Sequence, residues 1–310
     1  MSRAHRISLK RSLGLGEATF YGIGIIIGAG IYAIIGAGAG IAGNGLWLSF
    51  AIAAVIAGLT GLSYAELSSR LPKEAAEYHY TKRAFDKSTL AFSVGWVMII
   101  ANLIATATVS LGFAGYFSSL FNTPLVPVAA VLVLIMGAIN FIGIKESAKF
   151  NIIATLIEAG GLVVVIALAT PLLGTADFSI PAASWSGILP GAALIFFAFL
   201  GFEDVANISE ETKNARKVIP KALLIALAVS TLLYILTSLS ALALIGAPAL
   251  AASPAPLSDA VAAAAGPSAA GILSIIALFA TFNTALFLLI VSSRMLYGIA
   301  AGGDLPARLA

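Results

Sequence analysis

A run of glycines interrupts the first long apolar stretch of the chain. Tyr21–Gly40 reads YGIGIIIGAGIYAIIGAGAG and carries no charge, with Gly28 and Gly30 near its centre. Glycine inside a helix costs about 1 kcal/mol relative to alanine, so a cluster at mid-membrane needs a reason. A helix broken at Gly28–Gly30 would expose backbone N–H and C=O groups to a polar solute, which is tolerated at that depth only around a cavity or inside protein. The alternative is close helix packing through GxxxG spacings such as Gly36–Gly40.

A second stretch repeats this pattern of an apolar run with a glycine where a helix should continue. Phe196–Glu203 reads FFAFLGFE, and a second acid, Asp204, follows directly. A carboxylate in hydrocarbon is expensive unless it faces protein or water, so the pattern favours an interrupted helix. The alternative places both acids at the membrane interface, paired with nearby bases. Two broken spans, one beginning each half of a chain, indicate an inverted-repeat transporter.

One carboxyl group, that of Glu158, lies within the apolar stretch NIIATLIEAGGLVVVIALAT at 151–170. An acid at this depth predicts a functional site. Burial disfavours the charged form of a carboxyl group, so we expect Glu158 to bind and release protons near neutral pH. The alternative is a permanently protonated group that hydrogen-bonds a neighbouring helix.

The composition of the chain is that of a membrane protein. Its 310 residues are 60% hydrophobic and 10% charged, whereas soluble domains are about 45–50% apolar and about 25% charged. We therefore predict an all-α polytopic membrane protein. Eight stretches are apolar and long enough to cross a bilayer, at 17–39, 46–67, 89–121, 125–144, 150–170, 187–207, 219–246 and 270–301.

Other classes of protein find little support. The chain has no cysteine, and His5 and His79 lie outside the eight stretches, so an intramembrane enzyme or a metal site is not expected. A channel would require a polar stripe along several spans, which is not visible. We expect no cofactor and no nucleic-acid partner.

The positive residues predict the orientation. With eight spans, all 17 Lys and Arg fall on one side of the membrane. The opposite loops, near 40–45, 122–124, 171–186 and 247–269, carry only Asp177 and Asp259 as charges. Positive charge marks the cytoplasmic side, so we expect an integral protein of the cell membrane with a cytoplasmic N-terminus. The loop at 71–84 is expected to form a short amphipathic helix. The loop at 247–269 is expected to be an irregular cover or a short helix near 257–264.

Six motifs resemble the amino acid–polyamine–organocation transporter superfamily over essentially the whole chain. They are GAGIY at 28–32, YAELSSRLP with EYHYTKRAF at 64–85, NFIGIKESAKFN at 140–151, FFAFLGFEDVANISEETKN at 196–214, VIPKA at 218–222 and NTALFLLIVSSRMLYGIAAGGDLP at 283–306. The resemblance implies a five-plus-five inverted repeat with an amino acid site between broken spans one and six.

That fold implies four parts of the chain. They are a cytoplasmic tail at 1–16, a first repeat at 17–170, an outer loop at 171–186 and the start of a second repeat at 187–310. Spans nine and ten of the repeat are then missing, and so are two further spans that most members have. This apparent truncation makes a non-transporting amino-acid-binding sensor or partner an alternative to a transporter.

The resemblance also implies a binding site for the amino acid. The backbone of the first break suits the substrate carboxylate, because N–H groups and the positive dipole end meet at a helix start. Carbonyls before the second break suit the ammonium group. Phe197 or Phe202 is expected to form a lid or to face lipid, and Asn102 and Asn283 to line the pocket or to hydrogen-bond between helices. The substrate-binding residues are Ile27, Gly28, Ala29, Gly30, Ile31, Asn102, Phe196, Phe197, Ala198, Phe199, Gly201, Phe202 and Asn283.

Coupling and gating complete the prediction. Glu158 is expected to be the coupling group, because some members carry an ionisable residue there in place of a sodium ion. Ser292 and Ser293 would complete a sodium site in the alternative, unless they bond to their own helix. Glu66, Glu203 and Arg294 are expected at gates or as interfacial charges. The predicted function is proton-coupled uptake of neutral amino acids across the lipid bilayer; the alternatives are sodium-coupled or exchange-type carriage of amino acids or polyamines.

Overall fold

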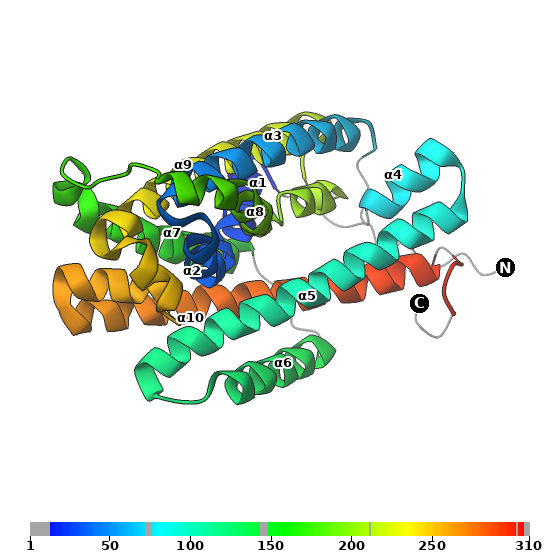
Figure 1. Ribbon diagram of the computed structural model, residues 1–310. Coiled ribbons are helices and arrows are strands. Elements are labelled where there is room, and N and C mark those ends of the chain that lie inside the picture. The colour runs from blue at the N-terminus through cyan, green and yellow to red at the C-terminus, as the bar shows by residue number, and fades with distance from the viewer. Residues whose placement is uncertain (1–12, 72–75, 143–147, 211, 302, 307–310) are drawn as a thin grey trace.

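The regular structure of the protein is helical (Figure 1). The computed structural model describes residues 13–71, 76–142, 148–210, 212–301 and 303–306. An all-helical chain is therefore confirmed for these ranges. The helices, with η denoting short 3-10 helices, are α1 (Leu15–Ile27), α2 (Gly30–Ala42), η1 (Gly43–Gly45), α3 (Leu46–Arg70), α4 (Ala76–Phe85), α5 (Ser88–Phe121), α6 (Leu125–Ile142), α7 (Ala148–Leu173), η2 (Ala182–Ser184), α8 (Trp185–Ile195), η3 (Phe196–Phe199), η4 (Glu203–Glu210), α9 (Ala215–Ala252) and α10 (Pro256–Ala301).

Seven helical stretches of the described chain are long and apolar enough to cross a membrane. The first of these, Leu15–Arg70, has 56 residues and contains α1, α2 and α3. At 1.5 Å per residue a straight helix of that length would extend about 84 Å, more than twice the hydrocarbon thickness of about 30 Å. The chain bends sharply at η1, where Gly43 has a φ of +55°. This stretch is therefore not one straight helix.

The helices form a packed bundle flanked by a long pair. α9 packs against α1, α2, α3 and α7, while α5 lies along α10. In Figure 1 the long α5 and α10 run beneath the bundle, with α6 on their outer side. The core of the bundle contains large buried side chains, among them Tyr32, Phe50, Phe199 and Tyr234. The surfaces of α6 and α3 expose apolar side chains, as expected for helices in lipid.

The glycines of the first apolar stretch have two different uses. A Cβ on Gly36 would lie 2.8 Å from both Leu250 O and Pro256 Cγ, so a larger residue would push α2 away from the end of α9. Gly28, in contrast, lies outside regular helix, between α1 and α2. Close packing and a broken helix, which the sequence leaves as alternatives, therefore apply to different glycines of one stretch.

The segment between the last two spans is helical. α9 and α10 each contain a kink, at Gly246 with a φ of +73° and at Gly266 with a φ of +83°. The part of α10 before its kink turns back on the rest, because Ser258 Oγ donates to Ala270 O at 2.8 Å. Of the two alternatives for the loop at 247–269, the helix near 257–264 is therefore the correct one.

Hydrogen bonds connect α4 to the chain after α10, and the chain before α1 to the chain after η4. The predicted amphipathic helix is present as α4, while residues 72–75 of its loop lie outside the described ranges. Tyr78 of α4 donates to Asp304 Oδ2 at 2.7 Å, and Lys82 Nζ donates to the Tyr78 hydroxyl at 2.9 Å. Leu13 also pairs with Thr212 in an isolated parallel bridge, in which Lys213 N–H donates to Leu13 O at 2.8 Å.

Candidate substrate-binding site

The first long helical stretch is interrupted at its centre. α1 ends at Ile27 and α2 begins at Gly30, with Gly28 at a φ of 9° and a ψ of −128°, outside the helical region. The first N–H groups of a helix have no intrahelical acceptor, and the helix dipole places partial positive charge there. The start of α2 therefore offers hydrogen-bond donors to an anion such as a carboxylate.

One of these donors is already bonded within the protein. Ala29 N–H donates to Oγ1 of Thr284 on α10 at 2.9 Å. A Cβ on Gly28 would overlap this same hydroxyl, so only glycine allows α10 to approach the break this closely. Thr284 therefore fixes the break, and the N–H groups of Gly30 and Ile31 are the donors that a ligand would meet.

The second interruption is longer than the first. α8 ends at Ile195, and the chain continues through η3, an extended Leu200 and η4. Gly201 has a φ of +106°, and a Cβ there would overlap Ile25 Cγ2 of α1. The two breaks also touch directly, because a Cβ on Gly30 would lie 2.8 Å from the Cα and O atoms of Ala198. Glycine is thus required at Gly30 and Gly201, where the two interrupted segments cross.

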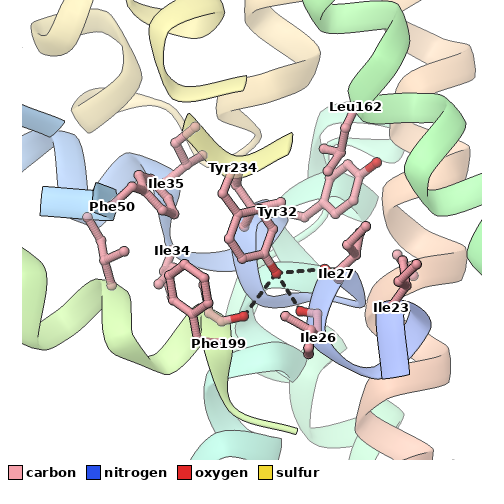
Figure 2. Close-up of a cluster of buried hydrophobic side chains, with 14 of the residues drawn as sticks. Ile23, Ile26, Ile27, Tyr32, Ile34, Ile35, Phe50, Leu162, Phe199 and Tyr234 are labelled. Atoms are coloured by element: carbon pink, nitrogen blue, oxygen red, sulfur yellow. Dashed lines mark hydrogen bonds between the residues drawn. The ribbon is translucent and has the colours of Figure 1, made fainter. Parts of the chain in front are cut away.

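A buried tyrosine of α9 joins the two breaks (Figure 2). The hydroxyl of Tyr234 donates to Ile26 O at the end of α1 and lies 2.9 Å from Ala198 O in η3, with Ile27 O at 3.4 Å. A phenol has one proton, so these carbonyls share a single donor. Two carbonyl-rich helix ends therefore converge on one point, which is the arrangement that suits an ammonium group.

Apolar side chains line the other side of the first break. Ala29 packs in a cluster with Val109 of α5 and Ala285 of α10, both buried, and with the half-buried Phe197 and Leu288. These side chains bring neither charge nor a hydrogen-bonding group to the break. Such a surface suits an apolar side chain.

Glu158 of α7 is fully buried close to the first break. The hydroxyl of Tyr32 in α2 donates to the backbone carbonyl of Glu158 at 2.8 Å. The Glu158 carboxyl group interacts electrostatically with both Tyr32 and Tyr234. α7 packs against α1, and Tyr32 ties it to α2, so a charge on Glu158 would act on both helices that form the break.

The phenylalanines of the second break have different surroundings. Phe199 is buried, with its ring centroid 5.2 Å from that of Tyr234, and Phe196 is half-buried against the core. Phe202 is 2% exposed and packs edge-on against Tyr64 at 5.6 Å, so it does not face lipid. Phe197 contacts the cluster around Ala29 and is the aromatic ring best placed to cover a ligand there.

The contacts with Ala29 at the first break come from neighbours of the two expected asparagines on α5 and α10. Asn102 Nδ2 lies 3.8 Å from Met295 Sδ, whereas Val109, seven residues and about 10 Å further along α5, contacts Ala29. On α10, Thr284 and Ala285 make the contacts with Ala29, next to Asn283 in the sequence. The structure therefore brings Asn102 to an interhelical contact and lines the break with smaller, apolar side chains.

The serines of the sodium alternative bond within their own helix. Ser292 Oγ donates to Leu288 O at 2.7 Å, and Ser293 Oγ donates to Leu289 O at 2.9 Å. The Ser293 hydroxyl also accepts a hydrogen bond from Asn140 of α6 at 2.7 Å. This is the back-bonding that the sequence leaves open for serines in a span.

The expected gate residues are spread over several positions. Glu66 is exposed and pairs with Arg70, one turn along α3, at 2.6 Å. Glu203 is buried and accepts a hydrogen bond from Gly201 N–H at 2.9 Å. The side chain of Arg294 lies outside the described part of the chain. Of the two whose side chains are described, Glu203 is the one that contacts a helix break.

Comparison of the sequence with known protein families identifies the family of this chain. The pattern described as amino acid permease matches residues 13–310. The chain belongs to the amino acid permease family, within the superfamily suggested by its motifs. This permease is thus an integral membrane protein of a transporter family and not an enzyme.

Three relatives show the breadth of the family. The branched-chain amino acid permease BcaP and a methylthioribose transporter, both of Bacillus subtilis, are each 32% identical to this chain. The two alignments include 97% and 98% of this chain, respectively, and 70% of each relative. The vacuolar cationic amino acid transporter 4 of Arabidopsis thaliana is 31% identical, over 96% of the permease and 54% of the relative. The permease thus spans about half the length of this plant relative.

A solved structure shows the same fold. The permease resembles the crystal structure of a manganese transporter of Eremococcus coleocola, with a TM-score of 0.61 and 16% identity over 98% of the permease and 68% of that chain. At this identity the likeness concerns the fold alone.

Proposed function

We propose that this permease is a secondary active transporter that carries neutral amino acids into the cell together with protons. The observation that carries this proposal is the meeting of two helix breaks, which are joined through Tyr234, while Thr284 anchors the first break to α10. Broken helices that face each other in the middle of a bundle are the usual place for substrate in transporters with repeated halves. The names of the relatives support carriage of amino acids or a related solute; the branched-chain permease is named for neutral amino acids, whereas the other two are named for methylthioribose and for cationic amino acids.

Each part of an amino acid has a partner at the breaks. The N–H groups at the start of α2 would bind the carboxylate, and the carbonyls of Ile26 and Ala198 would bind the ammonium group, in place of or beside the Tyr234 hydroxyl. The cluster of Val109, Phe197 and Ala285 would contain the side chain. No charge in this cluster would balance a cationic side chain, which favours a neutral amino acid.

Glu158 is the group that we propose for proton coupling. It is buried beside α1 and α2, and its charge acts on Tyr32 and Tyr234. Protonation would remove a negative charge next to the break and so change the balance between two positions of α1. Ser292 and Ser293, which would serve sodium, bond instead to their own helix.

The proposed architecture has eight spans and begins in the cytoplasm. In it, Leu15–Arg70 crosses the membrane twice, as a broken first span and as α3. Residues 17–170 would form a first repeat of five spans, and residues 187–310 the first three spans of an inverted second repeat. The basic residues would then face the cytoplasm of the cell.

Uptake into proteoliposomes tests both substrate and coupling. Labelled leucine, alanine and arginine are offered under an inward proton gradient or an inward sodium gradient, to the native permease and to Glu158→Gln. We expect leucine and alanine to accumulate with protons alone, and Glu158→Gln to bind leucine but to accumulate less than a tenth as much. Asp177→Asn, which changes an exposed acid, is the matched control.

Three outcomes would contradict parts of this proposal. Accumulation by Glu158→Gln under a proton gradient would remove Glu158 from coupling, and a sodium requirement would favour Ser292 and Ser293. Preferred uptake of arginine would contradict a neutral substrate. Binding without uptake under either gradient would identify a binding protein and not a transporter.

A further inference from the structure

A group of acidic and aromatic side chains lies where α3, α4 and η4 meet, at the end of the second break. The hydroxyl of Tyr64 on α3 donates to Glu77 Oε1 on α4 at 3.1 Å. The ring of Tyr64 lies against Tyr80 of α4, with centroids 6.4 Å apart, and against Phe202 at 5.6 Å. These contacts hold α4 against the chain that follows the second break.

Within the described residues, the charges that act on Tyr64 at this contact are all negative. The charged groups that act on Tyr64 are the carboxylates of Glu77, Glu203 and Asp204. Glu203 and Asp204 are 7% and 8% exposed, and Glu203 is also repelled by Glu77. On the opposite face of α4, Lys82 is engaged with Tyr78 and Asp304. Buried like charges cannot all ionise without a large cost, so the contact is favoured when a proton is bound.

The buried hydroxyl of Tyr80 also indicates that a bound proton favours this contact. Tyr80 is 7% exposed, and its hydroxyl has no hydrogen-bond partner within the described chain. The charge of Glu77 acts on it, so Tyr80 lies beside this acid. A polar group buried without a partner is costly and marks a position where one more hydrogen can be donated or accepted. Burial also raises the pKa of the Glu77 carboxyl group.

We propose that Glu77 and Glu203 form a second proton-binding site, separate from Glu158, which holds α4 against η4 when it is occupied. A proton from water would form an O–H bond on one carboxyl group, leaving one negative charge fewer and a new donor for the other carboxylate or for Tyr80. Loss of that proton leaves two carboxylates that repel each other across the contact. The site thus links the pH on the α4 side of the membrane to the position of α4.

The direction of the pH dependence follows from the raised pKa of Glu77. The docked arrangement of α4 binds a proton more tightly than the undocked one. Docking is therefore strongest below the ordinary pKa of a glutamate and weakens as the pH rises through the raised value. The effect requires no transport, so it can be measured whether or not the uptake experiment succeeds.

Cysteine labelling measures docking directly, because the chain contains no cysteine of its own. Ala206→Cys places a thiol at a fully buried position that packs against Tyr80, and Phe85→Cys places one at a position of α4 that is 62% exposed. The rate of labelling by a membrane-impermeant maleimide at position 206, divided by the rate at position 85, cancels the pH dependence of thiol reactivity. We expect this ratio to increase at least fivefold between pH 5.5 and pH 8.

Two variants decide between a proton site and an ordinary packing contact. Glu77→Gln imitates the protonated acid, so it should keep the ratio low at every pH, and Glu203→Gln should do the same. Asp86→Asn, an exposed acid at the end of α4, should retain the native pH dependence. A ratio that does not change with pH in the native background, or one that is high at every pH in Glu77→Gln, would overturn the proposal.

Discussion

The two helix breaks are built in different ways. The first occupies two residues, Gly28 and Ala29, between regular helices. Its own residues carry no charge, and the polar groups nearby are the Thr284 and Tyr234 hydroxyls and the buried Glu158. The second has no α-helix from Phe196 to Glu210, contains the left-handed Gly201 and adds two buried acids. One break is short and anchored on several sides, while the other is long and charged.

This difference indicates which break is able to change shape. A 3-10 helix has poorer hydrogen-bond geometry than an α-helix, so the chain from η3 to η4 can be rearranged at a lower cost. The first break holds its donors in place through contacts with α9 and α10. We expect the first break to provide a fixed binding surface and the second to move. Three variants test this comparison.

The largest effect is expected at Gly201. Gly201→Ala places a methyl group on Ile25 and forces alanine to a φ of +106°, and we expect loss of amino acid binding of at least 100-fold. Gly266→Ala is the matched control, because its φ is +83° but no atom lies within 4 Å of the added Cβ; it should cost only about 1–3 kcal/mol of stability. Calorimetric binding and thermal melts measure both. Native affinity in Gly201→Ala would contradict the close approach of the two breaks.

An intermediate effect is expected at Tyr234. Tyr234→Phe removes the hydroxyl that holds the carbonyls of Ile26 and Ala198 together. We expect the two carbonyls to separate and the affinity to fall about 10- to 100-fold, which corresponds to about 1–3 kcal/mol. Tyr116→Phe also removes a buried hydroxyl, which donates to Tyr32 O at 3.2 Å, but it does not join the breaks. Equal losses of amino acid affinity in the two variants would show that any buried tyrosine is sufficient.

The smallest effect is expected at Thr284. Thr284→Val keeps the shape but removes the acceptor of Ala29 N–H, so we expect about 1 kcal/mol, or roughly a fivefold loss of affinity. Thr284→Ser retains the hydroxyl and should bind as the native permease does. If serine and valine behave alike in the binding assay, the first break does not depend on this anchor.

The positions of both breaks were predictable because their signals are local. Gly28 and Gly30 in an apolar run, and Glu203 after Gly201, are features of short stretches of sequence. The helices α3, α5 and α6 begin within one residue of their expected positions for the same reason, since hydropathy is also local. The family could be recognised from motifs spread along the chain.

The residues that join the breaks were not predicted. Tyr234 and Ile26 are 208 residues apart, and Thr284 and Ala29 are 255 apart, so no local pattern connects them. A tyrosine in the middle of the apolar run LLYILTS was the one available signal. The contact of Val109 with Ala29 was not predicted either, because an apolar side chain beside a break has the same sequence signal as one in an ordinary helix contact.

The bridge between Leu13 and Thr212 has a mechanical consequence. It joins a residue two positions before α1 to a residue two positions after η4, while Tyr234 joins the same two segments at their other ends. Two segments that are connected at both ends cannot rotate independently of each other as whole units. Any change of shape in the second break would therefore be confined to the stretch between these two ties, around the left-handed Gly201.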